Sequence, residues 1–384
     1  MTELVLKGGR VLDPGRGVDQ ISDVAFADGR VRAIGPDLAV PPGAEVRDVR
    51  GLVVTPGLID LHTHVYWGGT SLGVDPLTIA RQMASPTLID AGSAGPGTLH
   101  GFRKFLIDGS PIRILPYLNL SYPGIFAFSQ SVMVGECADI RLLDSRECAR
   151  VAAANRDIVV GIKVRVGRSA SGTSGIAPLD MALDVAEEVG MPVMCHLDNP
   201  PPSRLEVIQR LRPGDVLTHC FRPFPNAPVT PDGRVREEIA AARERGVLFD
   251  IGHGGGSFGF KTTRAMLAAG FLPDVISSDV HEISIHGPAY DLLVTLSKFV
   301  CLGVPLPEVI RRATQTAGQA VQRAELGTLV EGGIGDASVL ELAEGDWSYR
   351  DVLGERLEGK QRLLARGMVA GGRWFEPAAQ PTIQ

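Results

Sequence analysis

Eight short apolar runs, separated by segments with helical periodicity, constrain the fold of this chain more than any other feature of its sequence. Apolar runs bounded by turn residues predict buried strands, and helical segments between them are typical of parallel strands joined by crossover helices. Eight such units favour a (β/α)8 TIM barrel over an open doubly wound α/β sheet. The predicted strands are residues 58–64, 86–91, 112–120, 158–164, 193–197, 216–220, 247–251 and 275–278, and amphipathic stretches at 177–189 and 234–245 predict two covering helices.

The two ends of the chain carry a different pattern. Residues 1–55 contain short alternating runs broken by turn signals such as Asp28-Gly29, which are typical of β-hairpins. Residues 328–384 have the same character. Because a small sheet needs a partner to bury its face, we expect the two ends to combine into one small β-sandwich domain beside a barrel of residues 56–327.

Composition narrows the class of protein. The chain has 384 residues, of which 44% are hydrophobic, and a formal net charge of -6 with both signs interspersed. This predicts a compact globular protein and argues against nucleic acid as a partner. No apolar run approaches the roughly 18 residues that span a bilayer, and the N-terminus lacks a signal-peptide pattern, so we expect a cytoplasmic protein with no membrane partner. Five sparse cysteines fit reduced thiols. The oligomeric state stays open, a homo-oligomer included.

Chemistry-bearing residues gather at the ends of the predicted strands. His62 and His64 end the first strand, and side chains two residues apart on a strand point the same way. Taken alone, such a pair is more often satisfied by backbone or water. Further candidates at later strand ends are Lys163, His196, His219 and Asp279. In a barrel these ends meet at one face, and four imidazoles with a lysine and a carboxylate match the N and O ligands that two divalent cations require.

Each later candidate also has a simpler explanation. A lone lysine in an apolar strand, here Lys163, is more often snorkelling or ion-paired. Asp279 could cap a following turn. Histidines such as His196 and His219 are often packed in a core. Their joint occurrence with the first pair of histidines favours the metal site.

These motifs resemble those of the amidohydrolase superfamily of metal-dependent hydrolases. The matching segments are residues 55–64, 161–165, 194–196, 217–219 and 277–279, in the family's order and across nearly the whole chain. The resemblance implies two divalent metal ions, with zinc the expected metal, and a carbamate formed from CO2 on Lys163 that bridges them. By the same resemblance His62, His64 and Asp279 hold the first metal, and His196 and His219 hold the second.

Three further runs resemble the deacetylase-type branch, some of whose members remove acetyl groups from α-acetoxy or α-acetamido carboxylates such as acetyl-mandelate. They are residues 64–69, 250–260 and 279–288. Dihydroorotases and hydantoinases, which open cyclic amides, are the nearby alternative. Dihydroorotases usually carry an arginine two residues after the paired histidines, whereas this chain has Tyr66. The substitution disfavours dihydroorotase activity.

The expected reaction is attack on an ester or amide carbonyl by a hydroxide held between the metals, with Asp279 as general base and then acid. The expected partner is a small carboxylate-bearing substrate, for which Arg165 and Arg168 are the guanidinium candidates. Loop residues that could also contact the substrate are Tyr122, His253 and His281. A non-catalytic scaffold with the same barrel is the rival from another class, and the complete ligand set weighs against it.

Overall fold

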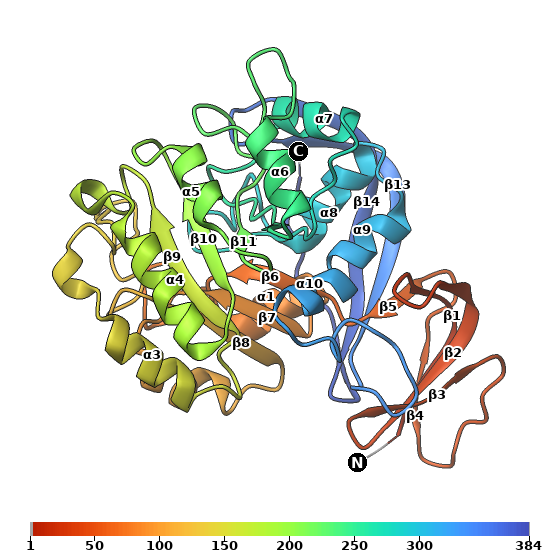
Figure 1. Cartoon of the computed structure of the whole chain (residues 1–384). Helices are drawn as coiled ribbons and strands as arrows, with labels where there is room; N and C mark the ends of the chain where they lie inside the picture. The colour runs from red at the N-terminus through yellow and green to blue at the C-terminus, as the bar shows by residue number, and fades with distance from the viewer. Residues whose placement is uncertain (1–2, 384) are drawn as a thin grey trace.

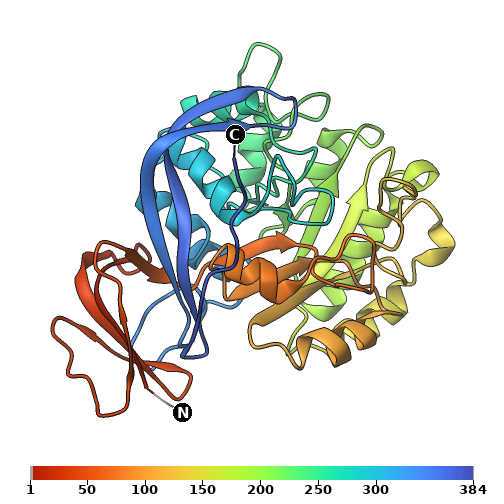
Figure 2. The same cartoon turned by 180° about the vertical axis from the view of Figure 1, so that it is seen from behind.

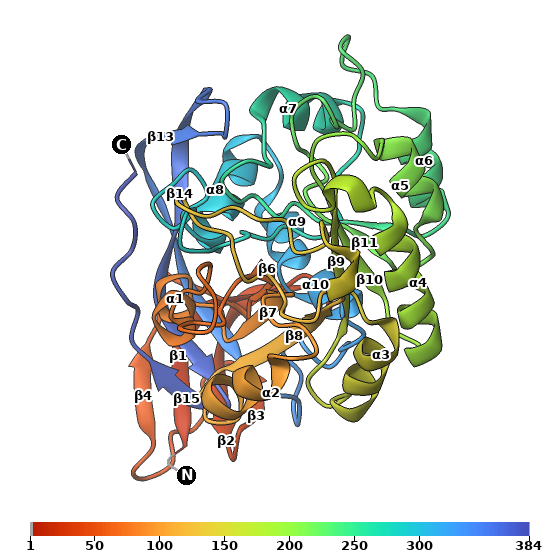
Figure 3. The ribbon, with the colours of Figure 1, turned by 90° about the vertical axis from the view of Figure 1, so that its left-hand side faces the viewer.

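The computed structural model describes residues 3–383, which form two separate β-sheets with helices packed around one of them (Figure 1). The sheet that carries the candidate residues has seven parallel strands in the spatial order β12-β11-β10-β9-β8-β7-β6. Its strands are β6 (Ile59–Thr63), β7 (Thr87–Ala91), β8 (Arg113–Asn119), β9 (Gly161–Val166), β10 (Val193–Leu197), β11 (Val216–Leu217) and β12 (Leu248–Phe249). The sheet curls on itself, so that the carboxyl ends of its strands face one site (Figure 3).

The eighth predicted strand, residues 275–278, is not a strand in the structure. The segment makes single parallel bridges, Asp250 with Val275 on one side and Thr63 with Val280 on the other. Between those bridges the Ser277 hydroxyl donates to the carboxylate of Asp250, which directly follows β12, and the Ser278 amide donates to the carboxylate of Asp60. Side-chain acceptors therefore take hydrogen bonds that a regular ladder would use.

Helices cover the outer face of the parallel sheet (Figures 1 and 3). They are α1 (Pro76–Gln82), α2 (Leu99–Phe102), α3 (Ser145–Ala154), α4 (Ala177–Val189), α5 (Arg204–Arg210), α6 (Glu237–Glu244), α7 (Phe260–Ala268), α8 (Leu292–Cys301), α9 (Leu306–Arg312) and α10 (Gln315–Ala320), with a π-helical turn at Arg103–Ile107 and 3-10 turns at Ile140–Leu142 and Gly172–Ser174. Helix α4 has the predicted bounds, because its apolar face packs inward and Gly190 ends it in the left-handed region at φ 64°. No helix among residues 3–383 is both long and apolar enough to span a bilayer.

The second sheet joins the two ends of the chain. It has eight strands, in the order β15-β14-β13-β5-β1-β2-β3, with β4 also paired to β1. They are β1 (Leu4–Asp13), β2 (Val18–Ala27), β3 (Arg30–Gly35), β4 (Glu45–Asp48), β5 (Val53–Pro56), β13 (Ala337–Arg350), β14 (Arg356–Ala370) and β15 (Arg373–Phe375). We expected a sandwich, but β5 hydrogen-bonds both β1 and β13, so one continuous ladder forms. The predicted Asp28-Gly29 turn connects β2 and β3 with φ values of 50° and 76°.

The hairpin of β13 and β14 extends well beyond the other strands of this sheet. Its two strands have 14 and 15 residues, and they rise from the small sheet along the side of the parallel sheet (Figure 2). Helix α8 packs against β14. The hairpin thus connects the terminal sheet with the helices that surround the candidate site.

Candidate metal centre

Six polar side chains converge at the carboxyl ends of the parallel strands. They are His62 and His64 from the end of β6, Lys163 from β9, His196 from β10, His219 just after β11 and Asp279 from the bridging segment. All line one cavity of about 40 Å3, together with Leu72, Ile125, Phe128, Arg165 and His281. Lys163 and Arg165 share this cavity because strand residues two apart face the same side. The cavity lining therefore combines polar side chains with the apolar side chains of Leu72, Ile125 and Phe128.

The distances are short enough for a shared ion. The Nε2 atoms of His62 and His64 lie 3.3 and 3.4 Å from the Asp279 Oδ1 atom. One ligand atom from each of these three residues lies within 4.8 Å of the others. The Lys163 Nζ atom is 3.5 Å from the His62 Nε2 atom.

The second pair of histidines completes the cluster. The rings of His196 and His219 have centroids 4.5 Å apart, and the ring of His219 lies 5.0 Å from that of His62. The His196 Nε2 atom is buried without a hydrogen-bond partner among the described residues. A buried polar atom without a partner is costly unless something binds it, so these nitrogens fit a metal ligand set.

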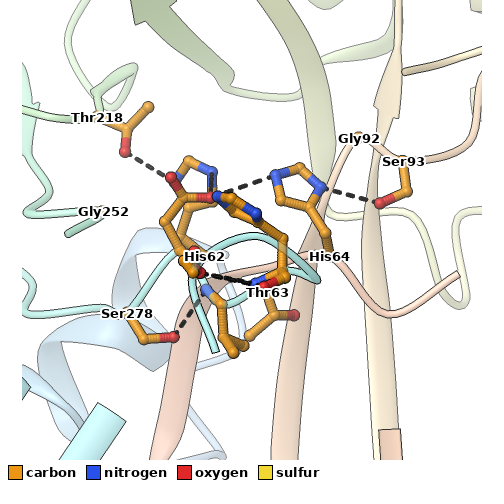
Figure 4. Close-up of polar contacts among 12 residues, drawn as sticks. His62, Thr63, His64, Gly92, Ser93, Thr218, Gly252 and Ser278 are labelled. Carbon is orange, nitrogen blue, oxygen red and sulfur yellow. Dashed lines mark hydrogen bonds and ion pairs between the residues drawn. The ribbon is translucent and has the colours of Figure 1, made fainter. Parts of the chain in front are cut away.

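Hydrogen bonds behind His62 fix which nitrogen carries its proton. The Thr218 hydroxyl donates to the Asp250 carboxylate over 2.6 Å, so it must accept from the His62 Nδ1–H, 2.8 Å away. The Nε2 lone pair of His62 therefore faces the cavity. Figure 4 shows Thr218 reaching His62 from one side while Ser93 reaches the Nδ1 atom of His64, 2.9 Å away, from the other.

A backbone carbonyl does the same for His219. The Nδ1 atom of His219 lies 2.6 Å from the Gly252 oxygen, which can only accept, so Nδ1 carries the proton. A Cβ atom on Gly252 would lie 2.8 Å from that nitrogen, and the φ of 44° also favours glycine there. Outer hydrogen bonds of this kind orient histidine ligands in metal proteins.

Electrostatics keep the histidines neutral. Burial holds the pKa of His62, His196 and His219 well below the ordinary value, and it lowers the pKa of His64 to about 3. Neutral imidazole is the form that binds metal. Burial also lowers the pKa of the fully buried Lys163 to about 8. No ion pair of Lys163 within 4.0 Å occurs among residues 3–383, and the carboxylates of Asp279 and Asp250 offset the effect of burial only in part.

Asp279 has the opposite shift. Burial raises the pKa of its carboxyl to about 6, which is the range of a general base that works near neutral pH. Its backbone is unusual as well, with φ 49°, and His219 has φ 62°. Non-glycine residues in the left-handed region concentrate at functional sites, where the surrounding structure holds them.

Two supporting carboxylates were not predicted from the sequence. Asp60 is fully buried on β6 and accepts from the amide and the hydroxyl of Ser278, which fixes the segment that carries Asp279. Asp250 is fully buried and accepts from Thr218 and Ser277. A charged residue inside an apolar run was the available signal in both cases, since an isolated buried carboxylate needs donors.

The structure separates the predicted substrate contacts into two groups. Arg165 and His281 line the cavity. Tyr122, Arg168 and His253 do not: Tyr122 and Arg168 are largely exposed, and His253 is fully buried behind the site against Lys298. Arg165 has a buried partner that the sequence did not reveal, because Glu136 lies on a loop with no periodic pattern; the Arg165 Nη1 atom is 3.2 Å from the Glu136 Oε2 atom.

Comparisons with known proteins find relatives along nearly the whole chain. No family model matches the chain. A deacetylase of Agrobacterium fabrum is 33% identical over 359 residues, which is 93% of this chain and 88% of the relative. A deacetylase of Enterococcus faecalis is 27% identical over 97% of this chain and 99% of its own length.

Solved structures give the same grouping. The crystal structure of a dihydroorotase matches with a TM-score of 0.90 and 31% identity, over 98% of this chain and all of the other. An adenine deaminase matches with a TM-score of 0.90 and 26% identity, over 98% of this chain and 100% of the other. With relatives of this identity along nearly its whole length, the chain belongs to the amidohydrolase superfamily of metal-dependent hydrolytic enzymes.

Proposed function

We propose that the protein is a binuclear metal-dependent hydrolase that removes an acetyl or other small acyl group from an α-substituted carboxylate. One observation carries the proposal: the six candidate ligands and the Arg165 guanidinium line the same small cavity. A metal centre supplies hydrolysis, and a guanidinium beside it supplies recognition of a carboxylate. The names of the deacetylase relatives support the acyl-group assignment.

The donor set fits two divalent metal ions, with zinc the expected metal. His62, His64 and Asp279 would hold one ion, and His196 and His219 the other. When bound, the ions supply an activated water and polarise the scissile carbonyl. The neutral state of the histidines and the lone pairs left on Nε2 by Thr218 and Gly252 support this assignment.

Lys163 would join the two ions as a carbamate. Its buried ammonium has no carboxylate partner and lies against a histidine nitrogen, so cations bound to the histidines would repel it. Loss of one proton from the ammonium gives the free amine, and addition of CO2 to that amine with loss of a second proton would leave a carboxylate-like anion in place of the positive charge. An anion at this position would suit two bound cations and would remove the buried positive charge.

Asp279 would move the proton. Its Oδ1 atom faces both histidines of the first ligand pair, and its pKa of about 6 leaves it ionised at neutral pH. It accepts a proton from the attacking water and returns it to the leaving alkoxide or amine. The same carboxylate thus serves as ligand, base and acid.

Arg165 and His281 would bind the substrate. Glu136 engages one nitrogen of the guanidinium, and the Arg165 Cζ atom lies 4.9 Å from the centroid of the Phe128 ring. The rest of the fork can pair with a carboxylate. The His281 Nδ1 atom accepts from the Ile283 amide over 3.2 Å, so its Nε2 carries the proton and can donate to a substrate oxygen.

Cyclic-amide hydrolysis is the second candidate, since a solved dihydroorotase is 31% identical to this chain. Tyr66 argues against it. The tyrosine ring stacks on Phe102, with centroids 4.5 Å apart, and its hydroxyl donates to the Thr98 oxygen over 3.3 Å. Tyr66 is therefore engaged outside the cavity and does not replace the missing arginine.

A hydrolysis screen of zinc-loaded protein separates the candidates. The panel contains O-acetyl α-hydroxy acids and N-acetyl amino acids of both hands, with hydantoins, dihydropyrimidines and dihydroorotate as the other arm. We expect turnover in the first arm only. Turnover confined to the cyclic amides would replace the proposal with the second candidate, and no turnover by protein with intact metal would remove both.

We also infer that the parallel sheet is a (β/α)8 barrel whose eighth position is held by residues 275–280. The bridges of Val275 and Val280 to opposite edges of the sheet support a closed ring. The division into residues 56–327 and a small domain of 1–55 and 328–384 is supported by the membership of the two sheets.

A further inference from the structure

A second buried lysine lies behind the metal centre. Lys298 is on α8, is fully buried, and has no carboxylate within 4.0 Å among the described residues. Its Nζ atom instead lies 2.8 Å from the Pro288 oxygen, 2.9 Å from the Arg350 oxygen and 2.6 Å from the His253 Nε2 atom. An ammonium has three N–H donors, and here each has an acceptor.

The tautomer of His253 shows that the lysine donates all three bonds. The His253 Nδ1 atom is 2.9 Å from the Gly254 oxygen, which can only accept, so Nδ1 carries the proton. Burial and the neighbouring lysine hold the pKa of His253 well below its usual value, so Nε2 is bare and accepts. Burial lowers the pKa of Lys298 to about 7, while the charges of Asp351 and Asp291 act in the opposite direction.

The histidine belongs to a loop that touches the metal ligands. On one side of it, the Gly252 oxygen accepts from the His219 ring over 2.6 Å. On the other side, Gly254 packs so closely against Asp279 that a Cβ atom there would lie 2.2 Å from the Oδ2 atom. A small shift of this loop would therefore change the orientation of the His219 ring and the position of the Asp279 carboxylate.

The other two acceptors belong to different parts of the chain. Pro288 follows the segment that carries Asp279, and Arg350 ends β13 at the tip of the long hairpin. The same tip holds the far end of the loop, because the Asp351 carboxylate accepts from the Phe260 amide over 2.9 Å and the Val352 amide donates to the Phe258 oxygen over 3.2 Å. Figure 2 shows the hairpin reaching this region from the small sheet.

We propose that Lys298 is a positioning residue, which clamps the 252–254 loop, the segment after Asp279 and the tip of the β13–β14 hairpin so that His219 and Asp279 keep their ligand geometry. A buried ammonium suits this task because its three donors point in fixed, divergent directions. The inference rests on the proposed metal centre. Through Lys298, the β13–β14 hairpin helps to position the ligands of a site to which it contributes no ligand itself.

The test measures zinc affinity by competition with a chelator, using full-length protein. Lys298→Met keeps the length of the side chain and removes the donors. We expect the affinity for the more weakly bound of the two zinc ions to fall about 10- to 100-fold. Loss of the hydrogen bonds that support metal ligands typically has an effect of this size. Leu293→Ala, a truncation of another buried residue on α8, is the matched control. It should lower the melting temperature while changing zinc affinity less than threefold.

His253→Leu is the second variant, and it keeps the proposal testable if Lys298→Met does not fold. It should also lower zinc affinity, and the double variant should lose no more than Lys298→Met alone, because Lys298→Met already removes the contact with His253. Wild-type affinity in either single variant, or an equal loss in Leu293→Ala, overturns the proposal. A wild-type protein that takes up no second zinc would instead refute the proposed metal centre.

Discussion

Replacing Arg165 with methionine tests how the substrate carboxylate is recognised. Methionine keeps much of the apolar length that contacts Phe128 and removes every donor. A hydrogen bond to a charged group contributes about 1.5 to 3 kcal/mol. At about 1.4 kcal/mol per factor of ten, kcat/KM for a carboxylate substrate should fall about 10- to 150-fold. The pair with Glu136 adds a separate effect on folding, which has to be measured independently.

The structure bounds that folding effect. Arg165 is 8% exposed and Glu136 is 1% exposed, so the variant leaves a carboxylate buried, and its Oε1 atom already lacks a partner among residues 3–383. Breaking a buried pair costs about 3 to 5 kcal/mol. The pair's separation of 3.2 Å is longer than a strong charge-assisted bond, so we expect a value near 3 kcal/mol. The double variant Arg165→Met with Glu136→Gln should recover part of this stability without recovering activity.

The assay compares an N-acetyl amino acid with its carboxamide analogue, on wild type and on the double variant. If Arg165 binds the carboxylate, the wild type prefers the acid and the variant treats both alike. Chemical denaturation reports the folding effect in parallel. An equal loss of kcat/KM on the acid and on the amide would refute the reasoning, because the guanidinium would then act on something common to both substrates.

Three further changes probe the centre. Thr218→Val removes the acceptor behind His62 and should weaken zinc binding about 10- to 100-fold in a chelator competition, with unchanged affinity as the contrary result. Asp279→Asn should lower kcat about 10²- to 10⁴-fold while elemental analysis finds much of the metal retained; near wild-type kcat would remove it as the base. Gly254→Ala, at φ 52°, forces the Asp279 carboxylate to move and should lower kcat about 10²-fold. Gly255→Ala, whose Cβ would meet nothing within 4 Å, should behave as wild type; equal effects of the two would contradict the packing argument.

The periodicity of apolar residues in the sequence predicted regular strands and helices. The strand expected at 193–197 and the helix expected at 177–189 coincide with β10 and α4. The ligand candidates also come together, since strand ends in a curled parallel sheet share one face. The segment 275–278 deviates because Ser277 and Ser278 bind carboxylates in place of neighbouring strands, and no period records that choice.

The surroundings of the ligands were beyond sequence reasoning. Glu136 is 29 residues from Arg165, and Lys298 is 45 residues from His253, so neither contact leaves a local pattern. The carbonyl of Gly252 acts through the backbone, which any residue type has. Sequence patterns thus indicated the ligand types, while the tautomers and the clamp behind them depend on tertiary contacts.

The central claim is that the six converging side chains hold two metal ions. Elemental analysis of zinc-reconstituted, dialysed protein tests it most directly, with His196→Ala as the comparison. We predict about two equivalents of zinc per chain in the wild type and about one in the variant, because His196 belongs to the second pair only. One equivalent or none in the wild type, or the same content in both proteins, would contradict the account.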